Sequence, residues 1–182
     1  MTMEEKTMKT ERVYEGKIIN LRVDTVELPD KKYSKREIVE HSGAVGIIAL
    51  TDSGNIVLVK QFRKPVEDSL LEIPAGKIEK DEEADACALR ELEEETGYRT
   101  SNMQKLISFY TTPGFSNEVI HLYLALDLDK GIATPDEDEY IEVVELSIQD
   151  ALEMIELGEI KDAKTIIGIL TANQRFLKKA NS

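Results

Sequence analysis

Carboxylates gather at the end of a predicted helix, where the helix dipole is negative and basic residues are usual. Glu91, Glu94 and Glu95 stand at i, i+3 and i+4, so their side chains share one face. Like charges at this spacing destabilise a helix by about 0.2–0.5 kcal/mol per pair. Divalent cations relieve such repulsion, and oxygen ligands suit Mg²⁺ or Mn²⁺. The pattern is consistent with a metal site, although the charges alone leave a solvated acidic face as the more usual interpretation.

The helix that carries this cluster lies between two glycines. Asp81 is its predicted N-cap, and Gly97 its predicted C-cap. Apolar residues recur at every fourth position and predict a narrow stripe that packs on a sheet, namely Ala84, Ala88 and Leu92.

The stretch from Gly76 to Tyr98, GKIEKDEEADACALRELEEETGY, resembles the Nudix box. Its glycines, Glu82, the Arg90-Glu91-Leu92 triplet and the Glu94-Glu95 pair all fall at the family's spacing, which is far more specific than a lone glycine motif. The resemblance implies an α/β protein with a Nudix fold, a mixed-sheet α/β/α sandwich, and a small N-terminal antiparallel sheet. It also implies metal-dependent hydrolysis of a nucleoside diphosphate linked to another moiety.

The composition is that of a globular protein, and its charge restricts the classes of partner that it could bind. The 182 residues are 41% hydrophobic and 32% charged, with a net charge of −13. This charge argues against a broad surface for nucleic acid or an anionic membrane. The polar N-terminus lacks the apolar core of a signal peptide, and residues 43–50 are too few to span a bilayer. With a single cysteine, Cys87, which is expected to pack in the core, these features predict a cytoplasmic protein.

The chain is expected to divide into an N-terminal strand segment, residues 1–41, and a Nudix domain, residues 42–182. Residues 1–10 are expected to be a loose leader. The patterning then predicts strands before residue 41, a hairpin around residues 52–55, and further strands on both sides of residues 113–117. Helices are expected at 148–157 and 162–179.

Short sequence segments around the box narrow the resemblance to the ADP-ribose pyrophosphatase branch. They are LEIPAG (71–76), FYTTPGFSNE (109–118) and DEDEYIEVVEL (136–146), together with the spacing from Gly97 to Pro113. The implied reaction converts ADP-ribose and water to AMP and ribose 5-phosphate. Other nucleotide sugars or dinucleoside polyphosphates are alternative substrates, and a non-catalytic nucleotide sensor or a pure interaction module is an alternative class.

The resemblance also assigns roles around the metal. It implies two to three ions of Mg²⁺ or Mn²⁺, held by Glu91, Glu94, Glu95 and the backbone carbonyl of Ala75. Arg90 would form salt bridges that orient the carboxylates, and Glu82 would be a supporting residue of the box. Gly76 and Gly97 would allow the backbone conformation that the motif requires. A general base is expected from the acidic loop 134–140. Its candidates are Glu137, which we prefer, and Glu139.

Cations are needed to bind the diphosphate in so acidic a protein. Arg63 is the first candidate, because a guanidinium suits phosphate, and Arg36 and Glu37 are the second. By resemblance the adenine would lie against Ile19 and Tyr33, the loop at Pro113 and Gly114 would contact substrate, and the N-terminal sheet would be exchanged within a homodimer. His41 and His121 have no metal-site neighbours in sequence and are expected to be structural.

Overall fold

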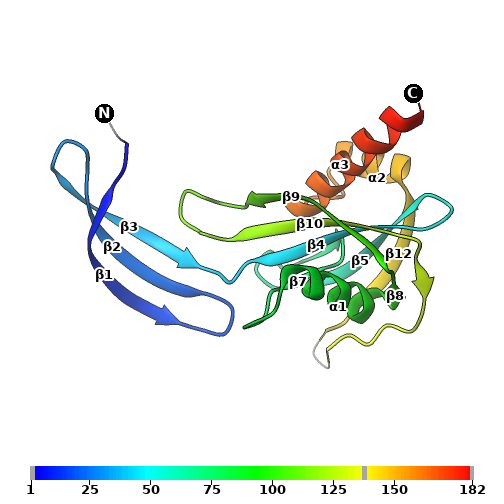
Figure 1. Cartoon of the computed structure of the whole chain (residues 1–182), viewed down its shortest axis with the longest axis horizontal. Helices are drawn as coiled ribbons and strands as arrows, with labels where there is room; N and C mark the ends of the chain where they lie inside the picture. Colours follow the sequence, from blue (N-terminus) through cyan, green and yellow to red (C-terminus); the bar gives the residue numbers. More distant parts are fainter. Residues whose placement is uncertain (1–2, 137–138, 181–182) are drawn as a thin grey trace. The chain divides into compact units, whose positions relative to one another are not determined.

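The computed structural model describes residues 3–136 and 139–180. The chain forms two units (Figure 1). The first comprises Met1–Gly43 with Tyr110–Val119, and the second comprises Ala44–Phe109 with Ile120–Ser182. The loop around Pro113 therefore belongs to the same unit as the N-terminal strands.

The second unit is built on a mixed sheet in the order β12-β5-β4-β10-β9, with β6 beside β5 and β7 beside β4. Strands β4 and β10 are parallel, whereas β5 pairs antiparallel with β4, β6 and β12. The strands are β4 (Ala44–Leu50), β5 (Asn55–Arg63), β6 (Asp68–Glu72), β7 (Ala75–Lys77), β9 (Asn102–Tyr110), β10 (Val119–Leu126) and β12 (Glu142–Ser147). A small separate ladder joins β8 (Tyr98–Arg99) to β11 (Asp129–Lys130).

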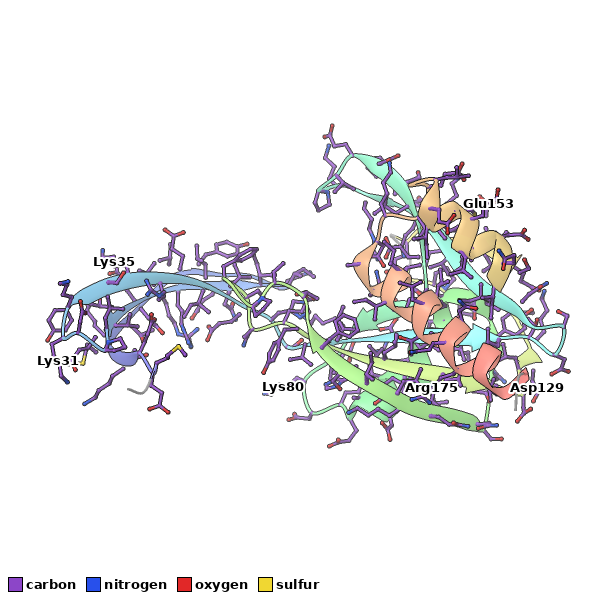
Figure 2. The ribbon with its side chains drawn as sticks, turned by 90° about the horizontal axis from the view of Figure 1, so that it is seen from above. Lys31, Lys35, Lys80, Asp129, Glu153 and Arg175 are labelled. Atoms are coloured by element: carbon purple, nitrogen blue, oxygen red, sulfur yellow. The ribbon has the colours of Figure 1, made fainter. Side chains whose placement is uncertain are left out.

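Alternation along the strands sends side chains into cores on both faces of this sheet. In β4, Ile48 and Leu50 join a cluster with α2 (Ile148–Glu156) and α3 (Ala163–Ala180). Their neighbours Val45, Ile47 and Ala49 join the opposite cluster, with Cys87, Ala88 and Leu92 of helix α1. Figure 2 shows α2 and α3 lying side by side. The predicted α/β/α sandwich is confirmed.

Helix α1 (Ala84–Thr96) ends as the sequence predicts but begins differently. Gly97 has φ 74° and donates its N–H to the carbonyl of Glu93 at 2.8 Å, as a C-cap glycine does. The predicted N-cap at Asp81 is wrong, because the helix begins after Glu83, which makes no side-chain cap. Asp81 instead adopts a turn with φ 64° before the helix.

The first unit holds an antiparallel sheet of β1 (Lys6–Glu15), β2 (Asn20–Glu27) and β3 (Tyr33–Glu40). The predicted loose leader is therefore wrong from Lys6 onward. Strand β1 is exposed along its length and is held by backbone pairing with β2. It therefore lacks the alternation of buried and exposed residues by which a strand is recognised in a sequence. The 110–119 loop joins β3, because Val39 donates to Phe115 O at 2.8 Å and accepts from Asn117 at 3.2 Å.

Among the described helices, none is long and apolar enough to cross a membrane.

Candidate metal and diphosphate site

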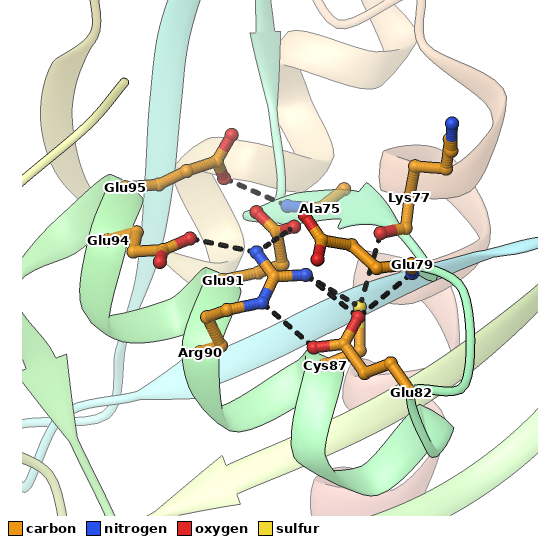
Figure 3. A network of polar contacts seen from close by, with 9 residues as sticks. All are labelled: Ala75, Lys77, Glu79, Glu82, Cys87, Arg90, Glu91, Glu94 and Glu95. Atoms are coloured by element: carbon orange, nitrogen blue, oxygen red, sulfur yellow. Dashed lines mark hydrogen bonds and ion pairs between the residues drawn. The ribbon is translucent and has the colours of Figure 1, made fainter. Parts of the chain in front are cut away.

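The carboxylates of the Nudix-like segment surround the guanidinium of Arg90 (Figure 3). Arg90 donates to both oxygens of Glu82, from Nε at 2.8 Å and from Nη2 at 3.0 Å. Its Nη1 donates to Glu91 at 2.7 Å and to Glu94 at 2.8 Å. This arrangement lowers the pKa of Glu82 to about 2 and raises that of Arg90, chiefly through the Glu82 contact. Arg90 is therefore a fixed counter-charge between the last turn of α1 and the loop before it.

Glu95 points away from Arg90 into the protein interior. It is only 4% exposed, and its Oε2 accepts the N–H of Ala75 at 2.9 Å. Burial raises the pKa of Glu95 to about 8, although the Ala75 N–H acts in the opposite direction. Burial also raises the pKa of Glu91. The site thus holds buried carboxyl groups for which burial disfavours the charged form.

Strand β7 approaches the carboxylates so closely that Gly76 has no room for a side chain. A Cβ at Gly76 would lie 1.9 Å from Cδ of Glu91. Gly76 is not among the residues with positive φ, so the sequence-based reason of backbone shape applies to Gly97, whereas Gly76 provides space. The missing side chain lets Glu91 lie directly against β7.

The donor set suits a hard divalent cation. Its groups are carboxylate oxygens with the Ala75 backbone alongside, and such oxygen ligands favour Mg²⁺ or Mn²⁺. Within residues 3–136 and 139–180, no three acidic, histidine or cysteine side chains are arranged as a group that could hold a metal ion. Arg90 engages Glu91 and Glu94 instead, so a cation would compete with it for their oxygens.

The acidic loop predicted to supply a base is anchored at the end of α1. Gly131 donates to Gly97 O at 2.8 Å, and Thr134 donates to Glu94 O at 3.0 Å. After burial and nearer groups, the charge of Glu139 contributes to the raised pKa values of Glu91 and Glu95. The structure therefore brings Glu139 into the electrostatic field of the cluster. Glu137 lies outside the described residues.

The predicted diphosphate-binding arginine, Arg63, ends β5 in the second unit. Its Nε and Nη2 donate to the two oxygens of Glu72 at 2.7 and 2.8 Å. Sequence reasoning missed Glu72, although a single acidic residue in the apolar run LLEIP was a visible signal. Its partners lie on β5 and α3, which sequence spacing does not bring together.

The other predicted substrate residues lie in the first unit. Arg36 on β3 pairs with Glu5, with its Nε donating at 2.9 Å. Glu37 and Tyr33 on the same strand are exposed. The remaining members are Ile19, Pro113 and Gly114.

The two histidines and the cysteine have the contacts and burial of structural residues, as the sequence predicts. His121 Nδ1 lies 2.7 Å from the hydroxyl of Ser108, and His41 Nδ1 accepts the N–H of Gly43 at 3.0 Å. Burial raises the pKa of the Cys87 thiol to about 12, which makes it a poor nucleophile.

Similarity to known proteins extends over most of the chain. The NUDIX domain model matches residues 40–167, and the model described as nucleoside diphosphate sugar hydrolase N-terminal domain matches residues 5–39. The chain is 52% identical over 170 residues to the ADP-ribose pyrophosphatase of Bacillus subtilis (strain 168), which covers 92% of each chain. It is 53% identical over 168 residues to the methanol dehydrogenase activator of Bacillus methanolicus, covering 91% of each.

A solved structure shares the fold at lower sequence identity. The crystal structure of ADP compounds hydrolase superposes with a TM-score of 0.85 and 19% identity, covering 99% of this chain and 98% of the other.

The buried carboxylate predicts an unusual pH dependence of stability without metal. The folded protein keeps Glu95 protonated up to about pH 8, whereas the unfolded chain releases this proton near the ordinary pKa of 4.5. Between these values the folded state binds more protons, so the free energy of unfolding falls as pH rises. In Glu95→Gln, we expect this decrease in the free energy of unfolding to be smaller than in the wild type by on the order of 3 kcal/mol. Thermal unfolding in a chelator across this pH range measures the effect.

Glu93→Gln is the matched control, because it removes a charge from the same turn where Glu93 pairs with the exposed Arg99. This variant is expected to keep the wild-type pH dependence. The same slope in Glu95→Gln as in the wild type would show that Glu95 is already ionised in the folded protein.

Proposed function

This chain belongs to the Nudix family, and we propose that it is a cytoplasmic enzyme that hydrolyses ADP-ribose to AMP and ribose 5-phosphate. The observation that carries the proposal is the complete acidic turn of α1, in which Glu91 and Glu95 lie against the Ala75–Gly76 strand and Glu94 shares the guanidinium of Arg90 with Glu91. The similarity to an ADP-ribose pyrophosphatase over almost the whole chain supports the substrate.

The proposal includes two to three Mg²⁺ or Mn²⁺ ions at this turn. Glu91, Glu94, Glu95 and the Ala75 carbonyl would hold them. When bound, such ions neutralise the diphosphate and lower the pKa of water. Arg90 keeps the carboxylates on one side of α1 through its contacts to Glu91 and Glu94.

A carboxylate of the 134–140 loop acts as the general base in this proposal. Glu139 is supported by the anchoring of its loop on Glu94 and by its electrostatic effect on Glu91 and Glu95. It would accept the proton of the attacking water while the bond between phosphorus and the bridging oxygen breaks. Glu137 remains the alternative base.

Substrate contacts are proposed for two separate sets of residues. Arg63 has a partly exposed guanidinium and would bind the diphosphate. Arg36 and Glu37 would bind polar groups of the substrate, and Ile19 with Tyr33 would contact adenine through their exposed apolar surfaces. The loop at Pro113 and Gly114 would also contact substrate.

We also propose a homodimer that exchanges the N-terminal sheet. This sheet leaves large apolar side chains exposed in a single chain, including Val13, Tyr14 and Tyr33. Small sheets with exposed apolar faces are rarely stable without a covering surface. A second copy of the chain would supply that surface.

The other classes of function have less support. A non-catalytic sensor would not need the full set of Glu91, Glu94 and Glu95, and a pure interaction module would not need to bury carboxyl groups there. Other nucleotide sugars and dinucleoside polyphosphates share the diphosphate chemistry, so they belong in the substrate comparison.

Product analysis tests the proposed reaction. The protein is incubated with Mg²⁺ and ADP-ribose, or with GDP-mannose or a dinucleoside polyphosphate in place of ADP-ribose. We expect AMP and ribose 5-phosphate to form fastest from ADP-ribose and only with metal. Faster cleavage of another compound would contradict the substrate, and binding of ADP-ribose without turnover would indicate a sensor.

Replacement of single carboxylates controls for the site. Glu94→Gln removes a proposed ligand and is expected to lower kcat by at least about 100-fold with the fold intact. Glu93→Gln removes an equal charge one residue away and is expected to retain activity within about threefold. Equal activity of both variants would assign the cluster to a solvated surface.

The close approach of β7 predicts the effect of a methyl group. In Gly76→Ala, the added carbon would push the Glu91 carboxylate out of place. Displacement of a catalytic ligand by about 1 Å can cost about 100-fold in rate, so we expect a loss of this size in kcat. The melting temperature is expected to change little, because a side chain can move. Wild-type activity in Gly76→Ala would show that the position of Glu91 is not critical.

A further inference from the structure

Glu72, at the end of β6, is a charged residue in the protein interior. Its side chain is 2% exposed, yet it accepts a bidentate pair of hydrogen bonds from Arg63 and a further contact from Lys164. Burial opposes its ionisation, but Arg63 and Lys164 together hold the pKa of Glu72 below its ordinary value. Replacing either this carboxylate or one of its cationic partners is costly, because the charge that remains in the interior loses its partner.

The surroundings of Glu72 fix its carboxylate in place. Lys164, at the start of α3, also pairs with Asp162 at 3.1 Å. The residues that follow Glu72 and Lys164 are also in contact. Ile73 donates its backbone N–H to the hydroxyl of Thr165 at 2.8 Å. Strand β5, through Arg63, and helix α3, through Lys164, therefore both hold the Glu72 carboxylate.

Arg63 differs from Glu72 because its side chain is 41% exposed. A guanidinium has more N–H donors than one carboxylate accepts, so binding Glu72 through Nε and Nη2 leaves further donors. Within the part of the chain that the structure describes, Glu72 is the hydrogen-bond partner found for Arg63. The remaining donors are suited to an anionic group.

The carboxylate cluster competes for such a cation. The charges of Arg63 and Glu95 affect each other's pKa values, as secondary effects after the Glu72 contact and burial. Arg90 shows what a guanidinium does near these groups, since it pairs with Glu91 and Glu94. Arg90 does so although it also binds Glu82, whereas Arg63 is held by the two-point contact of its Nε and Nη2 with Glu72.

We propose that Glu72 is a positioning residue that holds Arg63 by its Nε–Nη2 edge and keeps the other donors available to the substrate diphosphate. The inference rests on the proposed function, in which Arg63 binds that diphosphate. Glu72 does not touch the substrate and acts through Arg63 alone.

The test is a double-mutant cycle on ligand binding. Calorimetry in a chelator measures the Kd of ADP-ribose, and separately of ADP, for the wild type, Glu72→Gln, Arg63→Gln and the double variant. We expect Glu72→Gln to weaken binding about tenfold in the wild-type background and less than about twofold in the Arg63→Gln background. With Mg²⁺, the same change should raise KM more than it lowers kcat.

Two further variants separate positioning from stability. Glu72→Asp retains the buried charge but shortens the side chain, so it is expected to fold and to weaken binding as Glu72→Gln does. Lys164→Met perturbs the same buried network while leaving the Arg63–Glu72 pair, and it is expected to lower the melting temperature without changing Kd more than about twofold.

An equal loss of affinity in both Arg63 backgrounds would overturn the proposal, because Glu72 would then act through the fold. Unchanged Kd in a folded Glu72→Gln or Glu72→Asp would also overturn it. The outcome does not depend on turnover. A wild type that binds ADP-ribose or ADP but forms no products would contradict the proposed function and still decide the role of Glu72.

Discussion

The burial of carboxylates on the last turn of α1, together with their mutual repulsion, is the constraint on which the site depends. These groups are close together, two of them are largely buried, and the negative end of the helix adds to their cost. Arg90 compensates part of the charge, and the N–H of Ala75 stabilises Glu95. The remaining demand for positive charge is what a divalent cation would meet.

The neighbouring elements fit around this turn. Strand β7 comes close to the turn at Gly76, and the segment before the acidic loop passes close to Gly97, where a Cβ would lie 2.6 Å from the N atom of Ala133. Each of the two arginines near the cluster has its own carboxylate partner, Glu82 for Arg90 and Glu72 for Arg63. Paired in this way, positive charge is kept at fixed positions in a strongly acidic protein.

Sequence patterns were sufficient for features that local spacing determines. The period of alternation predicted the strands of the sandwich, and the i, i+3, i+4 spacing placed the glutamates on one face of α1. They failed where backbone pairing or tertiary contacts decide the structure. Strand β1 buries no side chains and so has no apolar signature, and the role of Glu72 depends on β5 and α3, which are distant in sequence.

If the acidic turn of α1 is a divalent-cation site, a titration with Mn²⁺ will show it. Calorimetry on the metal-free protein at pH 7 should show Mn²⁺ binding to the wild type and to Glu93→Gln with similar affinity. The double replacement of Glu94 and Glu95 by Gln should weaken this binding by at least about tenfold while the protein stays folded. Equal affinity in all three proteins would contradict the account.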